Sequence, residues 1–291
     1  MSTGLLAEDA PSVPTRGSVF RMRPRLGVSA ALGVTIVGAA VAAALIGPLV
    51  YRVSPLALGA SQLAPPSLTY PMGTDNLGRD ILARFIYGAR VSLAVGTLSA
   101  LVAVGIGSFV GGLAGYLGGR ADFFLMRVTE VFQVVPLFLL AIIIVALFGS
   151  GQANVILVIG ILSWPATARI ARGQVLVLRE EEYILAAKLS GATWARILTK
   201  HMLPNVVPYL VVSASLQTGS AILVAAFLGF LGLGDPSQPS WGLLLNQGQL
   251  YLTSAWWLPV FPGLGLSLTI LGLNLLGDGI GATLSQRQGT R

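Results

Sequence analysis

The sequence predicts an all-helical membrane protein with about six transmembrane helices. Of its 291 residues, 54% are hydrophobic and only 10% are charged, whereas an ordinary soluble domain carries about 25% charged residues. The mean hydropathy is +0.80. A soluble chain with so few charges could not cover its surface with polar groups, and lipid is the solvent that accepts the surplus apolar surface.

Six apolar runs support this prediction. A hydrocarbon core of about 30 Å needs about 20 apolar residues in a helix, and a helix satisfies its own backbone hydrogen bonds, which lipid cannot do. All six runs lack charged residues, although the fourth is short. They span residues 28–51, 91–119, 131–149, 152–168, 205–234 and 254–276.

The positive charges fix the orientation of these spans. With the N-terminus in the cytoplasm, only Arg52, Arg79, Arg84 and Arg90 of the 18 Lys and Arg residues lie outside, as the positive-inside rule requires. Both termini are then cytoplasmic. A secretory signal peptide is the alternative for the first run, but the run exceeds an ordinary signal-peptide core, so we expect a retained helix.

The predicted organisation follows from the spans. A large cytoplasmic loop, 169–204, interrupts a core transmembrane domain. The segments are a cytoplasmic tail (1–27), the first transmembrane helix (28–51), an extracytoplasmic segment (52–90), the core domain (91–284) and a C-terminal tail (285–291).

Small and polar residues within the spans indicate how the helices pack. Glycines recur every four residues in the second span and predict a ridge on which another helix lies closely; they are Gly107, Gly111, Gly115 and Gly119. Five polar residues of the fifth span should avoid lipid, either by lining an aqueous pathway or by bonding between helices. They are Ser213, Ser215, Gln217, Thr218 and Ser220.

The loop 169–204 predicts two short helices joined by a turn. The first follows Arg179, with acidic residues near its start, as the helix dipole favours. Gly191 is a suitable stop, and Thr193 can cap a second helix that runs to about His201 and ends before Leu203-Pro204. Spacing alone leaves two interpretations open, a docking surface for a partner or an amphipathic loop on the membrane.

This loop resembles the EAA loop of binding-protein-dependent ABC importer permeases. That pattern is Glu-Ala-Ala, three residues, Gly, nine residues, an apolar residue, one residue and Leu-Pro. Ala186-Ala187, Gly191 and Leu203-Pro204 match it, whereas Leu185 stands at the glutamate and His201 at the apolar position. Histidine at that point is usual in the dipeptide, oligopeptide and nickel branch, the DppC/OppC type.

Other stretches resemble the same branch in the same order. They are Met72 to Leu82, Tyr87 to Leu93, Phe230 to Gly234 with Trp241-Gly242, Pro262-Gly263 and Asn274 to Gly279. One departure follows Gly279, where the branch usually continues with a charged tail and this chain has Ile280-Gly281-Ala282.

The resemblance implies a type I ABC importer permease fold in a bacterial cell membrane. It also implies a second permease subunit, two cytoplasmic ATPase subunits or one fused ATPase, and an extracytoplasmic binding protein, with peptides as substrates and nickel chelates, haem or glutathione as alternatives. ATP and magnesium would bind the ATPases, and no cofactor, metal or nucleic acid is expected on this chain. The residues implied to couple to the ATPase are Glu182, Tyr183, Ala186, Ala187, Gly191, His201, Leu203 and Pro204.

The residues also weigh against other classes of protein. No Gly-Lys pair occurs, so the chain lacks the phosphate-binding loop of an ATPase. No charged residue lies in the middle of a predicted span, which argues against an ion-coupled secondary carrier. The single histidine lies in the loop, and no aspartate lies mid-span, which argues against an intramembrane protease.

Overall fold

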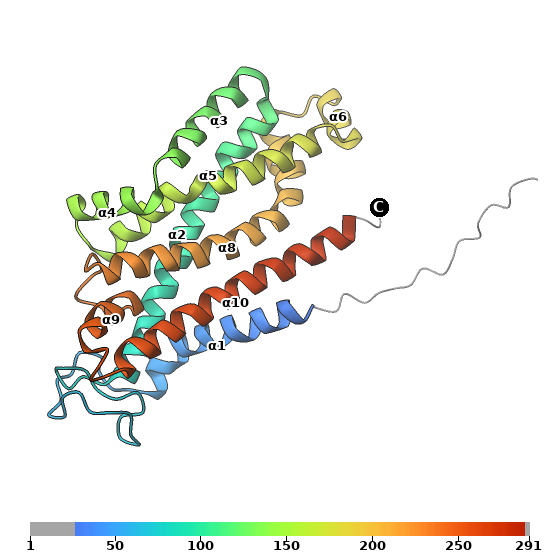
Figure 1. Ribbon diagram of the computed structural model, residues 1–291. Coiled ribbons are helices and arrows are strands. Elements are labelled where there is room, and N and C mark those ends of the chain that lie inside the picture. Colours follow the sequence, from blue (N-terminus) through green and yellow to red (C-terminus); the bar gives the residue numbers. More distant parts are fainter. Residues whose placement is uncertain (1–26, 289–291) are drawn as a thin grey trace, which may run out of the picture.

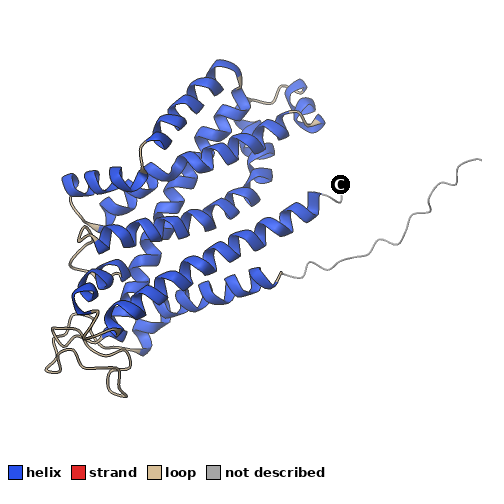
Figure 2. Ribbon diagram, viewed as in Figure 1, coloured by secondary structure: helices blue, strands red, loops and turns tan. Residues whose placement is uncertain are grey.

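The computed structural model describes residues 27–288, with side chains described as far as Thr283. The predicted N-terminal tail up to residue 26 and the last three residues of the C-terminal tail lie outside the described residues. Within the described part the chain is helical, and its only bridge of β type joins Thr74 to Asp80 (Figure 2).

The helices follow one another along the chain with one long connection, residues 51–80. Their bounds are α1 Val28–Val50, α2 Ile81–Leu117, α3 Gly119–Val134, α4 Leu137–Phe148, α5 Gln152–Arg179, α6 Glu182–Leu189, α7 Trp194–Arg196, the π-helix η1 Ile197–Met202, α8 Leu203–Phe230, α9 Trp241–Gly248, the 3₁₀ helix η2 Gln249–Tyr251 and α10 Trp257–Gln288.

Five helices of the described part are long and apolar enough to cross a membrane, and the bent pair α3–α4 makes a sixth span if it is counted as one. This confirms the predicted number of about six. The bend between α3 and α4 is 79°. Pro136 lies at the break, where its ring and missing N–H prevent the helix from continuing, so the predicted span 131–149 is not one continuous helix but contains the end of α3, the break and α4.

The second span starts earlier than predicted. Helix α2 begins at Ile81 rather than at residue 91, and the Asp80 carboxylate caps it by accepting the Ala83 N–H at 3.1 Å. With 37 residues, α2 is about 55 Å long and therefore extends beyond a hydrocarbon core of about 30 Å. Helix α5 likewise continues to Arg179, past the predicted end at residue 168.

The spans form a layered bundle (Figure 1). Helix α1 lies beside α10, α8 lies between α10 and α5, and α2 crosses behind them and packs on α5. The start of α1, the end of α10 and α6 lie toward the same side, and the connection 51–80 lies at the opposite end. One hydrophobic core lies among α2, α4, α5 and α8; its buried members include Val95, Val145, Ile159 and Leu228.

The contact between α2 and α5 is a contact between backbones. A Cβ atom added at Gly107 would lie 2.7 Å from the Trp164 carbonyl oxygen, and one at Gly111 would lie 2.1 Å from that of Ala168. Gly115 faces the Arg172 carbonyl in the same way, at 2.9 Å. Gly119 does not belong to this ridge: it is the first residue of α3 and has a φ of +55°, in the turn that follows α2.

The connection 51–80 is tied to three helices at the outer end of the bundle. The Arg84 guanidinium of α2 pairs with Asp75 at 2.5 Å and donates to the Gln247 side chain of α9 at 2.7 Å. The Trp257 indole of α10 donates to the Thr74 carbonyl at 3.2 Å. Arg84 is therefore a buried structural residue, although its position in the sequence is that of a loop charge.

Tyr51, just beyond the outer end of α1, is expected to lose its phenolic proton at a higher pH than an ordinary tyrosine. Burial, and then the hydrogen bond to Asp80 at 2.5 Å, raise its pKa from 10.0 to about 12. The bond's contribution to stability is fully present below pH 10 and is lost as the pH rises toward 12. A tyrosinate absorbance titration of the wild type minus that of Tyr51→Phe measures this group, and ionisation near pH 10 would contradict the assignment.

Candidate functional site

The predicted loop 169–204 folds back onto the cytoplasmic end of the bundle. Ile184 of α6 is fully buried, together with Ile197 and Met202 of η1, in a core that includes Val175 of α5 and Val206 of α8. The Lys188 ammonium lies 5.7 Å from the centre of the Tyr116 ring of α2. Helix α6 is therefore fixed to three spans rather than lying on the membrane as a separate amphipathic segment.

The turn after α6 has the conformation that glycine favours. Gly191 has a φ of +76°, and the Ala192 N–H donates to the Ala187 carbonyl at 3.1 Å, which closes the end of the helix. Thr193 then caps α7 by accepting the Arg196 N–H at 3.4 Å. The Cβ position of Gly191 meets no atom within 4 Å, so the backbone angle and not crowding requires glycine there.

One face of α6 is open to the cytoplasm. Leu189 is 90% exposed and Leu185, at the motif glutamate position, is 44% exposed. Glu182, Tyr183 and Ala186 are exposed too, whereas Ala187 is half-buried against the core. Desolvation, and then the charge of Glu181, raise the pKa of the Tyr183 phenol. The exposed face is thus mainly apolar, with carboxylates at its N-terminal end.

The second helix of the loop does not end at Leu203-Pro204, contrary to prediction. Helix α7 widens into the π-helix η1, in which the Leu203 N–H donates to the Leu198 carbonyl, and continues directly into α8. The wide turn leaves space for the proline ring, which would otherwise collide with the preceding turn. His201 is half-buried in η1, and Leu203 and Pro204 are exposed at the start of α8.

Asn205 is a structural member of this region that the sequence does not single out. Its side-chain amide donates to the His201 carbonyl at 2.7 Å and lies 3.4 Å from the Tyr183 hydroxyl. It therefore links α8 to both η1 and α6. In the sequence, only its position next to Leu203-Pro204 could have pointed to Asn205, because its partner Tyr183 is far away along the chain.

The five polar residues of α8 divide into two groups. Ser213 is buried and shares a 3.0 Å hydrogen bond with Thr167 of α5, and buried Ser215 donates to the Leu273 carbonyl of α10 at 2.7 Å. Thr218 is buried and donates to Ala214 within its own helix at 2.8 Å. These three sit in the helix packing, whereas Gln217 and Ser220 face an open hollow.

This polar hollow lies between α5, α8 and the α3–α4 bend. Its volume is about 410 Å³. The Gln217 amide donates to the Ser163 carbonyl of α5 at 2.7 Å. The polar lining residues are Gln133, Ser163, Arg169, Gln217 and Ser220. Sequence reasoning missed Gln133 and Ser163, and placed Arg169 only at the start of the loop.

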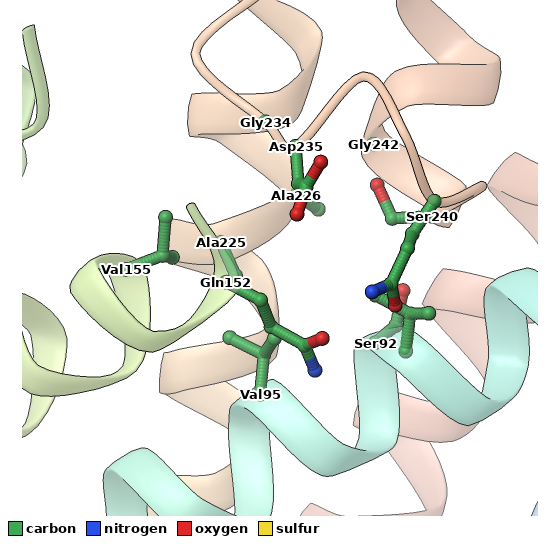
Figure 3. A pocket seen from close by; sticks show the side chains of 12 residues that line it. Ser92, Val95, Gln152, Val155, Ala225, Ala226, Gly234, Asp235, Ser240 and Gly242 are labelled. Atoms are coloured by element: carbon green, nitrogen blue, oxygen red, sulfur yellow. The ribbon is translucent and has the colours of Figure 1, made fainter. Parts of the chain in front are cut away.

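A second, much smaller pocket lies under the outer loop that follows α8 (Figure 3). Its volume is about 40 Å³, and Ser92, Gln152, Asp235 and Ser240 are among its lining residues. The hydrogen bond from the Ser237 hydroxyl, at 2.5 Å, lowers the pKa of Asp235, as does a bond from the backbone N–H of Gln152. Asp235 thus joins the outer loop to the first residue of α5.

A bundle of this kind, in which the short helix α6 packs on η1 and η1 continues into a span that borders a polar hollow, is typical of a multi-pass membrane permease. The chain belongs to the family of binding-protein-dependent transport system inner membrane components, whose model matches residues 103–290. It is therefore a permease subunit of an ABC importer in the bacterial inner membrane, a class of subunit that is generally non-catalytic.

Known relatives and structures agree with this family. The chain is 46% identical over 216 residues to the glutathione transport system permease protein GsiD of Pectobacterium atrosepticum, covering 74% of this chain and 72% of the relative. It is 43% identical over 221 residues to the dipeptide permease DppC of Bacillus subtilis, covering 75% and 69%. A putative peptide permease of Brucella suis is 38% identical over 280 residues, covering 96% and 93%.

The fold is that of a type I ABC importer permease. A structure of the inward-facing MetNI methionine ABC transporter superposes with a TM-score of 0.56, covering 67% of this chain and 93% of that chain at 20% sequence identity.

Proposed function

We propose that this chain forms half of a translocation pathway for small peptides, together with a second, homologous permease subunit. The relatives support a peptide substrate, because they include dipeptide permeases and a permease for glutathione, itself a tripeptide. The polar hollow supports a shared pathway, because it is open on one side of the chain and a second subunit would close it.

The observation that carries the proposal is the continuity between α6 and the hollow. Helix α6 is anchored by Ile184 to η1, and η1 runs without a break into α8, which presents Gln217 and Ser220. A force on α6 therefore acts on a pathway-lining helix through packed side chains and a continuous helix. Coupling of this kind requires two arrangements of the spans that are biased by a ligand.

The partners in the proposal follow from the family, and the geometry suggests where each would bind. The exposed face of α6 around Leu185 and Leu189 docks on a cytoplasmic ATPase, either one of two subunits or one half of a fused chain, and ATP and magnesium bind there rather than on this chain. The remaining motif residues, among them Ala186, Ala187, His201, Leu203 and Pro204, shape and support that face. A binding protein delivers the peptide at the outer end, where the connection 51–80 lies.

Substituting Gly191 by valine is expected to abolish ATP-driven peptide uptake while leaving membrane insertion intact. A β-branched residue at a φ of +76° costs about 1–2 kcal/mol, which suffices to displace the turn that orients α6. Uptake into proteoliposomes that hold the whole complex and the binding protein is the measurement. Gly191→Asn should retain much of the uptake, because asparagine tolerates this conformation.

Gly173→Val is the matched control for this experiment. Gly173 is exposed on α5, its Cβ position meets no atom within 4 Å, and its φ is not positive. We expect it to transport normally. Normal uptake by Gly191→Val would overturn the coupling role of α6, and the absence of ATP-driven peptide uptake by the wild-type complex would overturn the peptide substrate.

A further inference from the structure

The polar hollow has the size and composition of a small-molecule site. Its volume of about 410 Å³ lies within the range of about 300–1,000 Å³ that is usual for such sites. Apolar side chains such as Phe132 and Val224 form part of its wall, and two amides, two hydroxyls and one guanidinium provide the polar part. Ligand sites combine an apolar lining with a few polar groups in this way.

The charge in the hollow is positive and lacks a partner. Arg169 is the only charged residue that lines it, and no ion pair or hydrogen bond of the Arg169 side chain occurs within the described residues 27–283. One turn further along α5, Arg172 is held by Asp122 of α3 through bonds of 2.5 and 2.6 Å. The other acid of α3, Glu130, pairs with Arg127.

We propose that this hollow is the peptide subsite of the chain, and that Arg169 binds the terminal carboxylate of the peptide. The proposal rests on the proposed function. A guanidinium pairs with a carboxylate through two parallel hydrogen bonds, and no carboxylate of the hollow itself competes for it. The amides of Gln133 and Gln217 offer donors and acceptors for the peptide backbone, and the bond from Gln217 to Ser163 holds one of them in place.

The absence of cysteine from the whole sequence allows a direct binding test. A single Ser220→Cys substitution places the chain's only thiol at the wall of the hollow. Its modification rate by a thiosulfonate reagent is followed by mass spectrometry of this subunit in the purified complex with its ATPases. The probes are alanyl-phenylalanine and the same dipeptide amidated at its C-terminus, added without binding protein.

We expect the free dipeptide to slow modification and the amide to require a roughly tenfold higher concentration for the same protection, because it lacks a charge-assisted bond. Adding Arg169→Gln should abolish this difference, and Arg169→Lys should retain part of it. Ser54→Cys, exposed in the connection 51–80 and not among the residues that line the hollow, is the control whose rate neither probe should change. Val224→Cys, also on the wall, replaces Ser220→Cys if that variant does not assemble.

Two results would overturn this inference. Equal protection by the free dipeptide and its amide would show that Arg169 does not bind the peptide carboxylate. No protection by either probe, in a complex that still takes up peptide with ATP, would show that the peptide does not bind in the hollow. In that second case the peptide substrate of the proposed function would stand, since it fails only if the wild-type complex does not transport peptides.

Discussion

Replacing Arg84 by methionine is expected to remove most of the folded protein. Arg84 is 2% exposed, and its partner Asp75 also accepts the backbone N–H groups of Leu77 and Arg79, each at 2.8 Å. Without the guanidinium, the Asp75 carboxylate stays buried and unpaired, which costs about 3–5 kcal/mol. Such a loss is a large fraction of the roughly 5–15 kcal/mol by which folded proteins are stable. The yield of monodisperse protein and its thermal unfolding midpoint in detergent measure the effect.

Two variants make this prediction specific. Arg90→Met changes an exposed arginine of the same helix and should leave the yield unchanged. Arg84→Met combined with Asp75→Asn removes both charges and should recover part of the stability, because no ion is then left buried. A single Arg84→Met variant as stable as the wild type would show that the pair does not hold the connection 51–80 to α2.

Gly111→Leu should be at least as damaging, for a different physical reason. The first atom of any side chain at this position would lie 2.1 Å from the Ala168 carbonyl oxygen. Because that atom belongs to the backbone of α5, no rotamer change relieves the collision, and the two helices must separate. Membrane helices associate largely by such close packing, so we expect misfolded protein that is lost on detergent extraction.

Gly105→Leu is the matched control on α2. Its Cβ position meets no atom within 4 Å, and the residue is exposed on the surface of the chain. This variant should insert, extract and unfold like the wild type. If Gly111→Leu behaved in the same way as Gly105→Leu, the backbone contact between α2 and α5 would not be needed for folding.

Local signals in the sequence predict most of the helices. The predictions fail where contacts with residues distant in the sequence decide the structure. The apolar runs locate the spans, and Gly191 and Thr193 mark the turn after α6 because their conformational preferences act within a few residues. The start of α2 is misplaced because Arg84 and Arg90 have the same signature in sequence, and only the distant Asp75 and Gln247 make Arg84 a buried residue.

The candidate site, too, was predicted from the sequence only where its residues are neighbours along the chain. The coupling loop is contiguous in sequence, so its pattern is visible there. The hollow is assembled from Gln133, Ser163, Arg169, Gln217 and Ser220, which come from three parts of the chain. Among the polar residues of α8, the sequence could not separate Ser213 from Ser220, since only the positions of α5 and α10 decide which hydroxyl is covered.

The glycine contact between α2 and α5 also limits how this subunit can change shape. Carbonyl oxygens of α5 lie opposite the bare Cα atoms of Gly107, Gly111 and Gly115, and in return Gly160 of α5 faces the Ser99 carbonyl of α2. Sliding either helix would drive these oxygens against neighbouring side chains. We therefore expect α2 and α5 to move together as one rigid body, so that a change between inward-open and outward-open forms would take place at the other helix contacts of the subunit.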